Sequence, residues 1–567
     1  STSAIWHRFS LLVFLVGALA VFLTGVRGSA LALITGVILF GFMYAMTFGS
    51  VRARKLTMSL AALIFLIAGA LYLSRDTDFV KKNQYLSRYS DFSPTAYTVK
   101  TRFWAWRAGF DGFNDSLKNL AVGPGPENFN LPFSKHFYPK FFRGLGSETL
   151  FDRAHNQFLE ILFTMGIVGF VPYILIFIFA FRDLKPAELP RALDRGETGV
   201  LRLGLMATLV AYMIHNFFIF DTAANYLMFF MVLGLISNLN QTKLAEKNSR
   251  SKPGRSSSLG GRSVLAGLVG AVLAVAGAIL VYYTDIKPSR ANYATTRAIV
   301  ASWNSQHDLS FEKYKIALKY NTFGKYEIRH RYAQYVLERY NSRKLDDEAV
   351  ERLLTAIQYV QKNAGEFPGD YLPYLYLSRS YILLGRADRN SPYNDLALEN
   401  SIRAIELSPT FIRSHYEAAQ AYLNKKDYTE AIKHFKKALE LNPDVPLSWW
   451  YLGVSQFESG DRDGGVETIL AALNKGFEFD QNEADLIRLI NVFLHSKDYR
   501  RIAGYYEKLI KLQPRDAQYH ASLATTYIQL GNIDGAVSEA KAAAEIDPSF
   551  EAEARAFVKS LGRSWPR

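Results

Sequence analysis

Long apolar stretches separated by short polar connectors fill the first half of the chain, whereas the second half mixes apolar and charged residues at short spacing. A helix needs about 20 mainly apolar residues to cross roughly 30 Å of hydrocarbon. Seven stretches are apolar enough to be considered: 9–25, 28–48, 56–74, 157–181, 201–219, 222–239 and 263–283. The pattern predicts a bundle of transmembrane helices within residues 1–240, one more transmembrane helix at 263–283, and a separate domain over residues 284–567.

Basic connectors predict which side of the membrane each segment faces. The connectors 50–56, 181–202 and 243–262 are rich in Lys and Arg, and short loops of this kind stay in the cytoplasm. Residues 241–262 are therefore expected to form a basic cytoplasmic linker. Alternation of the helices then places a large loop, 75–156, and the whole of 284–567 outside the cytoplasm.

A repeat of fixed period organises the C-terminal half. The segments 415–443 and 520–548 align residue for residue, and Pro443 follows Pro409 by 34 positions, as Pro548 follows Pro514. This is the tetratricopeptide period, in which stacked helix pairs bury a shared apolar face. Further copies are expected at 449–473 and 374–409, with more divergent helix pairs at 300–370 and 482–514. The predicted fold class is all-α: a polytopic transmembrane helix bundle with a large extracytoplasmic loop, followed by a tetratricopeptide-like α-solenoid.

The composition excludes several kinds of functional site. The chain has no cysteine, which excludes disulfides, thiolate metal sites and cysteine nucleophiles. The net charge is +14, but the basic residues are spread over connectors and helices without a compact basic and aromatic stripe, which argues against nucleic acid as a partner. The outer loop carries 12 Lys and Arg against 8 Asp and Glu; this excess suits an anionic, lipid-linked partner and equally suits an ordinary solvated loop.

Polar residues recur at the predicted outer ends of the apolar stretches. Arg27 lies in the corner TGVRG, Arg102 in RFWAW, and His155 and Asn156 directly before the stretch 157–181, while His215 lies in IHNFFIFD. Each has a structural alternative, since an Arg at such a corner often anchors to headgroups and a His at a helix boundary is often a cap. Ionisable groups at membrane depth are costly, so several together favour a functional site.

Other catalytic sets are weaker. The loop carboxylates show no metal-ligand spacing, and no metal site is predicted from them (Asp111, Asp115, Glu127, Glu148 and Asp152). The segment VGPGPENF lacks the strand and helix that flank a nucleotide-binding loop, and we interpret it as a turn of the outer loop.

Four motifs in order resemble one known family. They are LTGVRGSALALI, RFWAW followed by AVGPGPENF, HNQFLEILFTMGIVG and HNFFIFD, and together they cover about residues 9–240. The set resembles the bacterial O-antigen ligase and O-antigen polymerase superfamily, which includes protein O-oligosaccharyltransferases. The resemblance implies a multi-pass enzyme of the bacterial cytoplasmic membrane that moves a glycan from an undecaprenyl-pyrophosphate carrier to an acceptor hydroxyl outside. Members of the family have more spans before the outer loop, so an N-terminal set of spans is expected to be missing from this sequence.

The residue types fit that transfer. Arg27 and Arg102 are the candidates for stabilising the charge that builds on a leaving pyrophosphate, a task that needs no metal or cofactor. His155 is the candidate base for the acceptor hydroxyl. Asn156, Trp106 and His215 are candidate substrate-binding residues. Attack opposite the leaving group would invert the anomeric carbon.

Two functions stay open. In the first, the chain is a glycosyltransferase whose repeats recruit a protein acceptor or an assembly partner, with ligase, polymerase and protein transferase all possible. In the second, it is a non-catalytic membrane scaffold that presents repeats for envelope or surface-polysaccharide assembly. A scaffold should tolerate the loss of Arg27, Arg102 and His155, and an enzyme should not.

Overall fold

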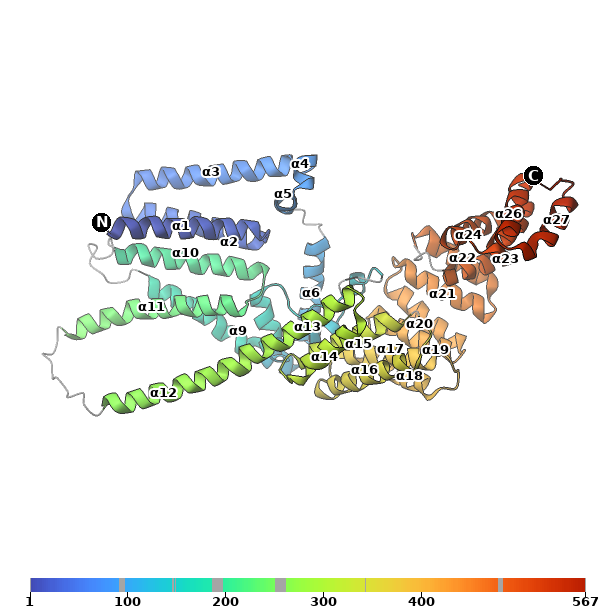
Figure 1. Ribbon diagram of the computed structural model, residues 1–567. Coiled ribbons are helices and arrows are strands. Elements are labelled where there is room, and N and C mark those ends of the chain that lie inside the picture. Colours follow the sequence, from blue (N-terminus) through green and yellow to red (C-terminus); the bar gives the residue numbers. More distant parts are fainter. Residues whose placement is uncertain are drawn as a thin grey trace. The chain divides into compact units, whose positions relative to one another are not determined.

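The computed structural model describes residues 2–90, 97–144, 147, 149–185, 197–249, 262–341, 343–477 and 483–565 (Figure 1). These residues form helices and connecting turns, with no strand among them, which confirms the all-α fold class. The chain divides into two compact units. The first comprises Ser1–Tyr138 and Thr149–Asp285, and the second comprises Pro139–Glu148 and Ile286–Arg567.

Long apolar helices make up most of the first unit. Within the described residues, five helical segments are long and apolar enough to span a membrane (Arg27–Phe48, Val51–Leu73, Gln157–Leu184, Thr198–Phe218 and Gly267–Trp303), and two shorter apolar helices cover Arg8–Leu23 and Ala223–Leu239. Every predicted stretch therefore coincides with an apolar helix. The complete helices are α1 (Thr2–Leu23), α2 (Arg27–Phe48), α3 (Val51–Leu73), α9 (Gln157–Leu184), α10 (Glu197–Phe218), α11 (Ala223–Ser249) and α12 (Arg262–Val281).

The surfaces of these helices suit lipid on one side and close packing on the other. Helix α3 buries no residue, and Phe65 and Leu73 are 77% and 84% exposed, which water would penalise and a hydrocarbon layer would not. Small residues lie where α2 meets α10: a Cβ on Gly28 would stand 2.7 Å from the Phe218 Cβ, and one on Gly36 would stand 3.0 Å from the Ala211 Cβ. Glycine thus permits the short distance between these two helices.

The outer loop contains helices of its own. They are α4 (Asp78–Lys82), α5 (Gln84–Ser90), α6 (Tyr97–Phe113), α7 (Leu117–Val122), α8 (Asn130–Lys135) and the 3₁₀ turn η1 (Pro139–Phe141). Helix α6 packs on α9, where Gly109 leaves room for the Phe163 ring. Phenylalanines fill the space between them, with the Phe163 ring centroid 4.8 Å from that of Phe110 and 6.0 Å from that of Phe129.

A kink in α9 meets the turn that the VGPGPENF segment forms. Gly166 interrupts the helix with φ 61° and ψ −167°, a conformation almost restricted to glycine. A Cβ there would lie 2.4 Å from the Ala121 carbonyl, and one on Gly123 would lie 2.3 Å from the Thr164 oxygen. The amide of Gly125 donates to that Thr164 oxygen at 2.8 Å. Two glycines therefore let the backbone of the outer loop lie directly on the backbone of α9.

Stacked helix pairs form the second unit. Their helices are α13 (Lys287–Trp303), α14 (His307–Lys319), α15 (Lys325–Tyr340), α16 (Asp347–Glu366), α17 (Tyr371–Gly385), α18 (Pro392–Leu407), α19 (Ile412–Asn424), α20 (Tyr428–Leu441), α21 (Pro446–Ser459), α22 (Arg462–Asn474), α23 (Glu483–His495), α24 (Tyr499–Leu512), α25 (Ala517–Gln529), α26 (Ile533–Ile546), the turn η3 (Pro548–Phe550) and α27 (Glu551–Ser560). Their order follows the predicted repeats. The alanines at the predicted close contacts are at most 2% exposed (Ala419, Ala431, Ala438, Ala524, Ala536 and Ala543).

Side-chain caps begin the second helix of successive repeats at equivalent places. Asp427, Asp461, Asp498 and Asn532 each accept a hydrogen bond from the backbone amide three residues later. Such caps satisfy amides that the first helical turn leaves without a partner. The capping residues in the turns therefore repeat along the chain, as the buried apolar positions do.

Two predicted boundaries differ from the structure. Residues 241–249 of the predicted linker continue α11, and 250–261 lie outside the described residues. Helical residues also continue past 283, because a π-helical turn, Tyr282–Ile286, joins α12 to α13. The apolar signal ends there, but the backbone hydrogen bonding does not.

Candidate active site

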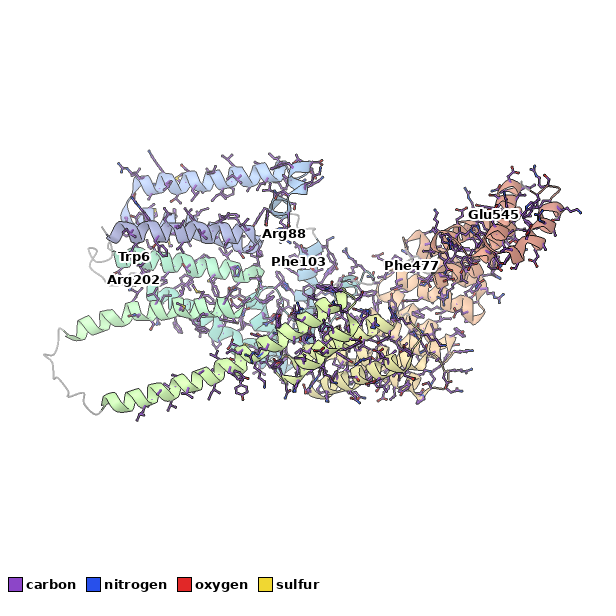
Figure 2. All side chains as sticks on the ribbon, in the orientation of Figure 1. Trp6, Arg88, Phe103, Arg202, Phe477 and Glu545 are labelled. Carbon is purple, nitrogen blue, oxygen red and sulfur yellow. The ribbon has the colours of Figure 1, made fainter. Side chains whose placement is uncertain are left out.

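Arg27 is the first residue of α2, directly after a turn in which Gly25 adopts φ 66°. Helix α5 lies against this corner, since the Tyr89 hydroxyl donates to the Phe22 carbonyl at 3.0 Å. The Arg88 side chain covers Gly25, where a Cβ would stand 2.9 Å from the Arg88 Cδ. Figure 2 labels this exposed arginine on α5. The corner thus holds a second guanidinium that the sequence patterns did not indicate.

Arg102 lies on α6 and is half-buried. Burial lowers the pKa of Arg102, and the positive charge of Arg27 lowers it further. Arg27 on α2 therefore repels Arg102 on α6 electrostatically. Such repulsion is relieved when an anion binds between like charges.

Trp106 connects α6 to the residues before α9. It follows Arg102 by one helical turn, and therefore shares its face of the helix. The indole Nε1–H donates to the Ala154 carbonyl at 2.7 Å, and the ring lies 6.4 Å from that of Phe217. One hydrogen bond thus holds the turn that carries His155 against the helix that carries Arg102.

His155 occupies a strained turn between aromatic rings. Its φ of 53° is in the left-handed region, which is unfavourable for a residue with a Cβ and is typical of functional sites. The Nδ1–H donates to the Arg153 carbonyl at 3.1 Å, because a carbonyl can only accept. The neutral ring therefore keeps its basic lone pair on Nε2. Phe151 and Phe220 each lie 5.5 Å from the imidazole.

Asn156 and Gln157 fix the start of α9. The Asn156 side-chain oxygen accepts from the amides of Phe158 and Leu159 at 3.0 and 3.1 Å, so it caps the helix. The Gln157 amide donates to the Ile219 carbonyl at 3.1 Å, and its side-chain oxygen accepts from the Asp221 amide at 2.8 Å. This end of α9 is therefore attached to the corner between α10 and α11.

Asp221 closes a buried polar network at that corner. Its Oδ2 accepts from the Tyr212 hydroxyl at 2.7 Å and from the Asn216 side chain at 3.0 Å. Burial raises the pKa of Asp221, and the two donors lower it in part. The carboxylate thus orders the same corner that receives Gln157.

His215 lies on α10, beside α2. Its Nδ1 is 3.2 Å from the Ser29 Oγ, and the Asn225 side-chain nitrogen is 3.5 Å from its Nε2. If the Asn225 amide donates, Nδ1 carries the proton and donates to Ser29. Ser29 is two residues from Arg27, so His215 orders the helix start that presents the arginine.

Sequence patterns did not reveal the ion pairs that Arg153 forms next to the turn of His155. Glu160 is 2% exposed and accepts from the Ala154 amide at 2.6 Å. The Arg153 guanidinium reaches Glu127 at 2.8 Å, approaches Glu160 at 4.0 Å, and lies over the Phe220 ring at 5.2 Å. A Glu within the apolar run FLEILF is the signal that could have revealed this pair, since a carboxylate at membrane depth needs a partner.

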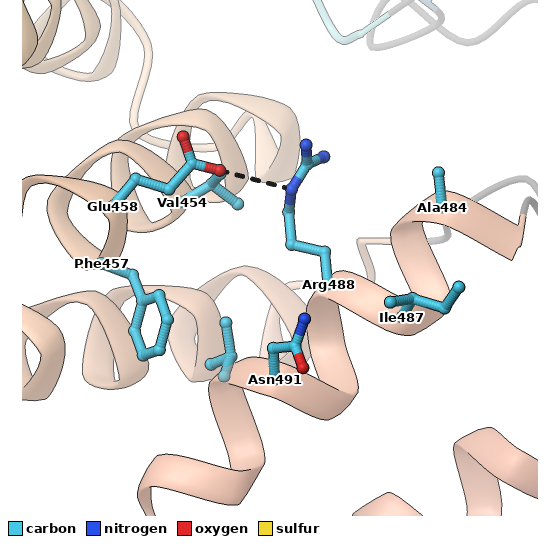
Figure 3. A pocket seen from close by; sticks show the side chains of 8 residues that line it. Val454, Phe457, Glu458, Ala484, Ile487, Arg488 and Asn491 are labelled. Carbon is cyan, nitrogen blue, oxygen red and sulfur yellow. Dashed lines mark ion pairs between the residues drawn. The ribbon is translucent and has the colours of Figure 1, made fainter. Parts of the chain in front are cut away.

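A metal centre and a pocket are the other kinds of site to consider. Among the residues that the structure describes, no three His, Asp or Glu side chains are grouped so as to hold a metal ion. A pocket of about 330 Å³ lies in the repeats between α21 and α23, where Glu458 and Arg488 form an ion pair at 3.6 Å (Figure 3). The predicted site residues are not part of its lining, which consists of Val454, Phe457, Glu458, Ala484, Ile487, Arg488, Asn491 and Val492.

Comparison with family models divides the chain in the same way as its patterns. Residues 12–174 match the model described as O-antigen ligase. Residues 412–445 and 488–549 match tetratricopeptide-repeat models. Arg27, Arg102 and His155 all lie inside the first match.

Individual relatives share only part of the chain. It is 24% identical over 250 residues to anaphase-promoting complex subunit 3 of Schizosaccharomyces pombe, covering 43% of this chain and 36% of that protein. It is 28% identical over 207 residues to the Hsp70-Hsp90 organizing protein of Triticum aestivum, covering 35% and 32%. The chain thus spans about a third of the length of these curated relatives.

Solved structures with a similar fold include two repeat proteins. One is YrrB, described as a TPR protein with an unusual peptide-binding site (18% identity, 35% of this chain and 97% of that chain, TM-score 0.28). Another is TTC0263, a thermophilic TPR protein of Thermus thermophilus (19% identity, 36% and 99%, TM-score 0.29).

Proposed function

We propose that the chain is a membrane glycosyltransferase, since residues 12–174 match the O-antigen ligase model and two later segments match tetratricopeptide-repeat models. It takes a glycan from an undecaprenyl-pyrophosphate carrier and transfers it to an acceptor hydroxyl outside the cytoplasmic membrane of a bacterium. The observation that carries the proposal is the hydrogen bond from Trp106 to Ala154, which joins the helix of Arg102 to the turn of His155.

The arginines bind the diphosphate. As the bond between the sugar and the phosphate oxygen breaks, its electrons move to that oxygen, and the developing charge is stabilised by guanidiniums that are already in place. In this mechanism Arg27 on α2 and Arg102 on α6 bind that oxygen, and Arg88 on α5, whose side chain covers Gly25, adds positive charge at the corner that carries Arg27. Three guanidiniums can supply the charge that a divalent cation supplies elsewhere.

His155 activates the acceptor. Its Nε2 accepts the hydroxyl proton while the hydroxyl oxygen attacks the anomeric carbon, which inverts the configuration of that carbon. The resulting imidazolium is held by the bond from Nδ1–H to the Arg153 carbonyl. The ring is fixed by Phe151 and Phe220, so orientation is established before the substrate arrives.

The repeats recruit the acceptor side. Tetratricopeptide arrays stack helix pairs into extended binding surfaces, and we propose that the domain after α12 lies outside the cytoplasm and binds a protein acceptor or an assembly partner. A ligase, a polymerase and a protein transferase differ in the acceptor that this surface would recruit. Deletion of the gene, followed by mass spectrometry of surface glycans and glycoproteins, identifies the product that disappears.

Transfer by the full chain in membrane vesicles tests the proposed chemistry. With a labelled lipid-linked glycan as donor, His155→Ala should abolish transfer and keep carrier binding, whereas Arg102→Ala should weaken carrier binding as well. His136→Ala is the matched control, because His136 belongs to the same loop but pairs with Asp115 at 3.0 Å. Full transfer by His155→Ala would remove it from the mechanism, and full transfer by both variants would favour the scaffold.

A further inference from the structure

Part of the outer loop folds with the repeats. Pro139–Glu148 belongs to the second unit, whereas Tyr138 and Thr149 on either side of it belong to the first. The segment also lies inside the match to the O-antigen ligase family. A peptide from the ligase domain is therefore an integral part of the repeat unit.

Asn442 binds the backbone of this segment. Its side-chain amide donates to the Pro139 carbonyl at 3.3 Å and to the Phe142 carbonyl at 2.9 Å. Within the segment, the Phe142 amide donates to the Pro139 carbonyl at 3.0 Å. Asn442 is 4% exposed, so the pairing takes place away from water, where an unpaired amide would be costly. The segment is bound as a single tight turn.

Phe142 fills an apolar site in the same repeats. The side chain is 1% exposed and belongs to the core of α19, α20 and α21, with Ile412, Phe435, Val445 and Leu452. Its ring lies 5.8 Å from that of Tyr416, edge to face. Lys140 and Arg143 on either side are exposed. Backbone pairing and a buried aromatic anchor are the features of a bound peptide.

Asn442 directly precedes Pro443, and asparagine occurs at this position in only one of the four repeat ends that are marked by a proline. Ser408, Gln513 and Asp547 occupy the position of Asn442 in the other copies. Ser408 and Asp547 carry no amide group, and the Gln513 amide donates to Glu483 at 2.7 Å. The binding site for the turn 139–142 therefore depends on Asn442 of one repeat and is not a general property of the repeats.

We propose that the repeat array acts as a clamp on the outer loop, with 139–142 as its internal peptide ligand, and that the clamp positions the loop for transfer. Asn442 and Phe142 are then positioning residues, because Arg102 and His155 belong to the same loop on either side of the clamped turn. Without the clamp, the turn regains conformational freedom that transfer must remove again. Only this dependence of transfer on the clamp rests on the proposed function.

Proteolysis of the full chain tests the clamp without any assay of transfer. Trypsin should cut after Lys140 roughly tenfold faster in Asn442→Ala than in the parent protein, the factor expected for two neutral hydrogen bonds. Gln513→Ala is the matched control at the equivalent repeat position, and it should leave this rate unchanged. Equal rates in Asn442→Ala and the parent protein would overturn the clamp.

Reversible crosslinking tests whether transfer depends on the clamp. The chain has no cysteine, so Phe142→Cys with Tyr416→Cys can be joined by a cleavable thiol crosslinker without background. Phe142→Cys with Ala521→Cys, which places the second thiol at the equivalent position of a distant repeat, should not be joined. Failure of the first pair to join would contradict the observed contact.

The crosslink should rescue transfer when Asn442 is absent. In Asn442→Ala that also carries Phe142→Cys and Tyr416→Cys, we expect a lower kcat with an unchanged KM for the lipid-linked donor before crosslinking, restoration of kcat by the crosslink, and loss again on cleavage of the linker. A variant with misfolded repeats would not respond in this way. Rapid proteolysis with unchanged kcat would disprove the coupling. Absence of transfer in the parent protein would refute the proposed function. The proteolysis experiment would still show whether the repeats bind the turn 139–142.

Discussion

Replacing Trp106 by Phe should slow transfer by releasing the turn of His155. The change removes one N–H, the donor of the 2.7 Å bond to the Ala154 carbonyl. The phenyl ring retains most of the apolar contact with the neighbouring Phe217. Ala154 is fully buried, so water cannot easily replace the lost donor.

The size of the effect follows from the buried carbonyl and from the strain beside it. An acceptor left unsatisfied in the interior costs about 1–3 kcal/mol. The next residue, His155, has φ 53°, a conformation that costs a non-glycine residue on the order of 1–3 kcal/mol unless its surroundings hold it. If the turn relaxes to avoid the first cost, the reactive conformation becomes roughly 5- to 150-fold less populated.

A single-turnover assay measures this population directly. Labelled lipid-linked glycan is bound first, acceptor is added, and the first transfer is followed, with carrier affinity determined separately. We expect the rate to fall by the factor above while carrier affinity stays within about twofold, less than half a kcal/mol. Trp104→Phe is the matched control, because it removes the same N–H from a ring that packs on Tyr97 and Tyr138.

Two results would contradict this reasoning. An unchanged rate in Trp106→Phe would show that the bond to Ala154 does not hold His155 in place. A fall in carrier affinity equal to the fall in rate would instead identify Trp106 as a substrate-binding residue, the role that the sequence predicts for it.

Three further predictions concern the backbone, the metal and the pH. Gly166→Ala should destabilise the first unit by about 2–6 kcal/mol, because the φ and ψ of Gly166 are strained for alanine and the new Cβ would meet the Ala121 carbonyl at 2.4 Å. Thermal unfolding in detergent measures this change. Gly69→Ala is the control, because a Cβ at Gly69 meets no atom within 4 Å. Transfer should persist in EDTA, measured with the vesicle assay, since in the proposed mechanism guanidiniums take the role of a divalent cation. A rate that EDTA lowers and added Mg²⁺ restores would count against this. Burial lowers the pKa of His415 to about 4, so between about pH 6.5 and 4 the unfolded chain binds a proton that the folded repeat excludes, and stability should fall on acidification by up to about 1.4 kcal/mol per pH unit. A pH series of unfolding midpoints checks the slope, which should be shallower in His415→Gln.

Local patterns predicted most of the fold, because apolar runs and a 34-residue period are properties of neighbouring residues. They could not predict where α12 ends, since the backbone continues through a π-helical turn after the apolar residues stop. They also missed the helices of the outer loop. Helix α4 has 5 residues and α7 has 6, too few for their own periodicity to be visible, and isolated helices of this length depend on contacts with the rest of the fold.

The candidate site was predicted as residue types and not as geometry. Sequence order gives Arg27, Arg102 and His155, but not the left-handed backbone of His155 or the electrostatic influence of Arg27 on Arg102. These depend on residues far apart in the chain. The bond from Asn442 to Phe142 joins positions 300 residues apart, and no local pattern specifies such a partner.

Several hydrogen bonds hold the turn of His155, three of them to partners from different parts of the chain, and this explains why a strained residue can persist there. Trp106 donates to the Ala154 carbonyl, Glu160 accepts from the Ala154 amide, and Gln157 pairs with the Asp221 amide. These partners come from α6, from α9 itself and from the corner before α11. Each bond is worth about 1 kcal/mol, so together they match the strain of one left-handed residue. Loss of any one should release the imidazole before it unfolds the helices, and the stability of the unit and the rate of transfer should therefore respond separately to substitutions in this turn.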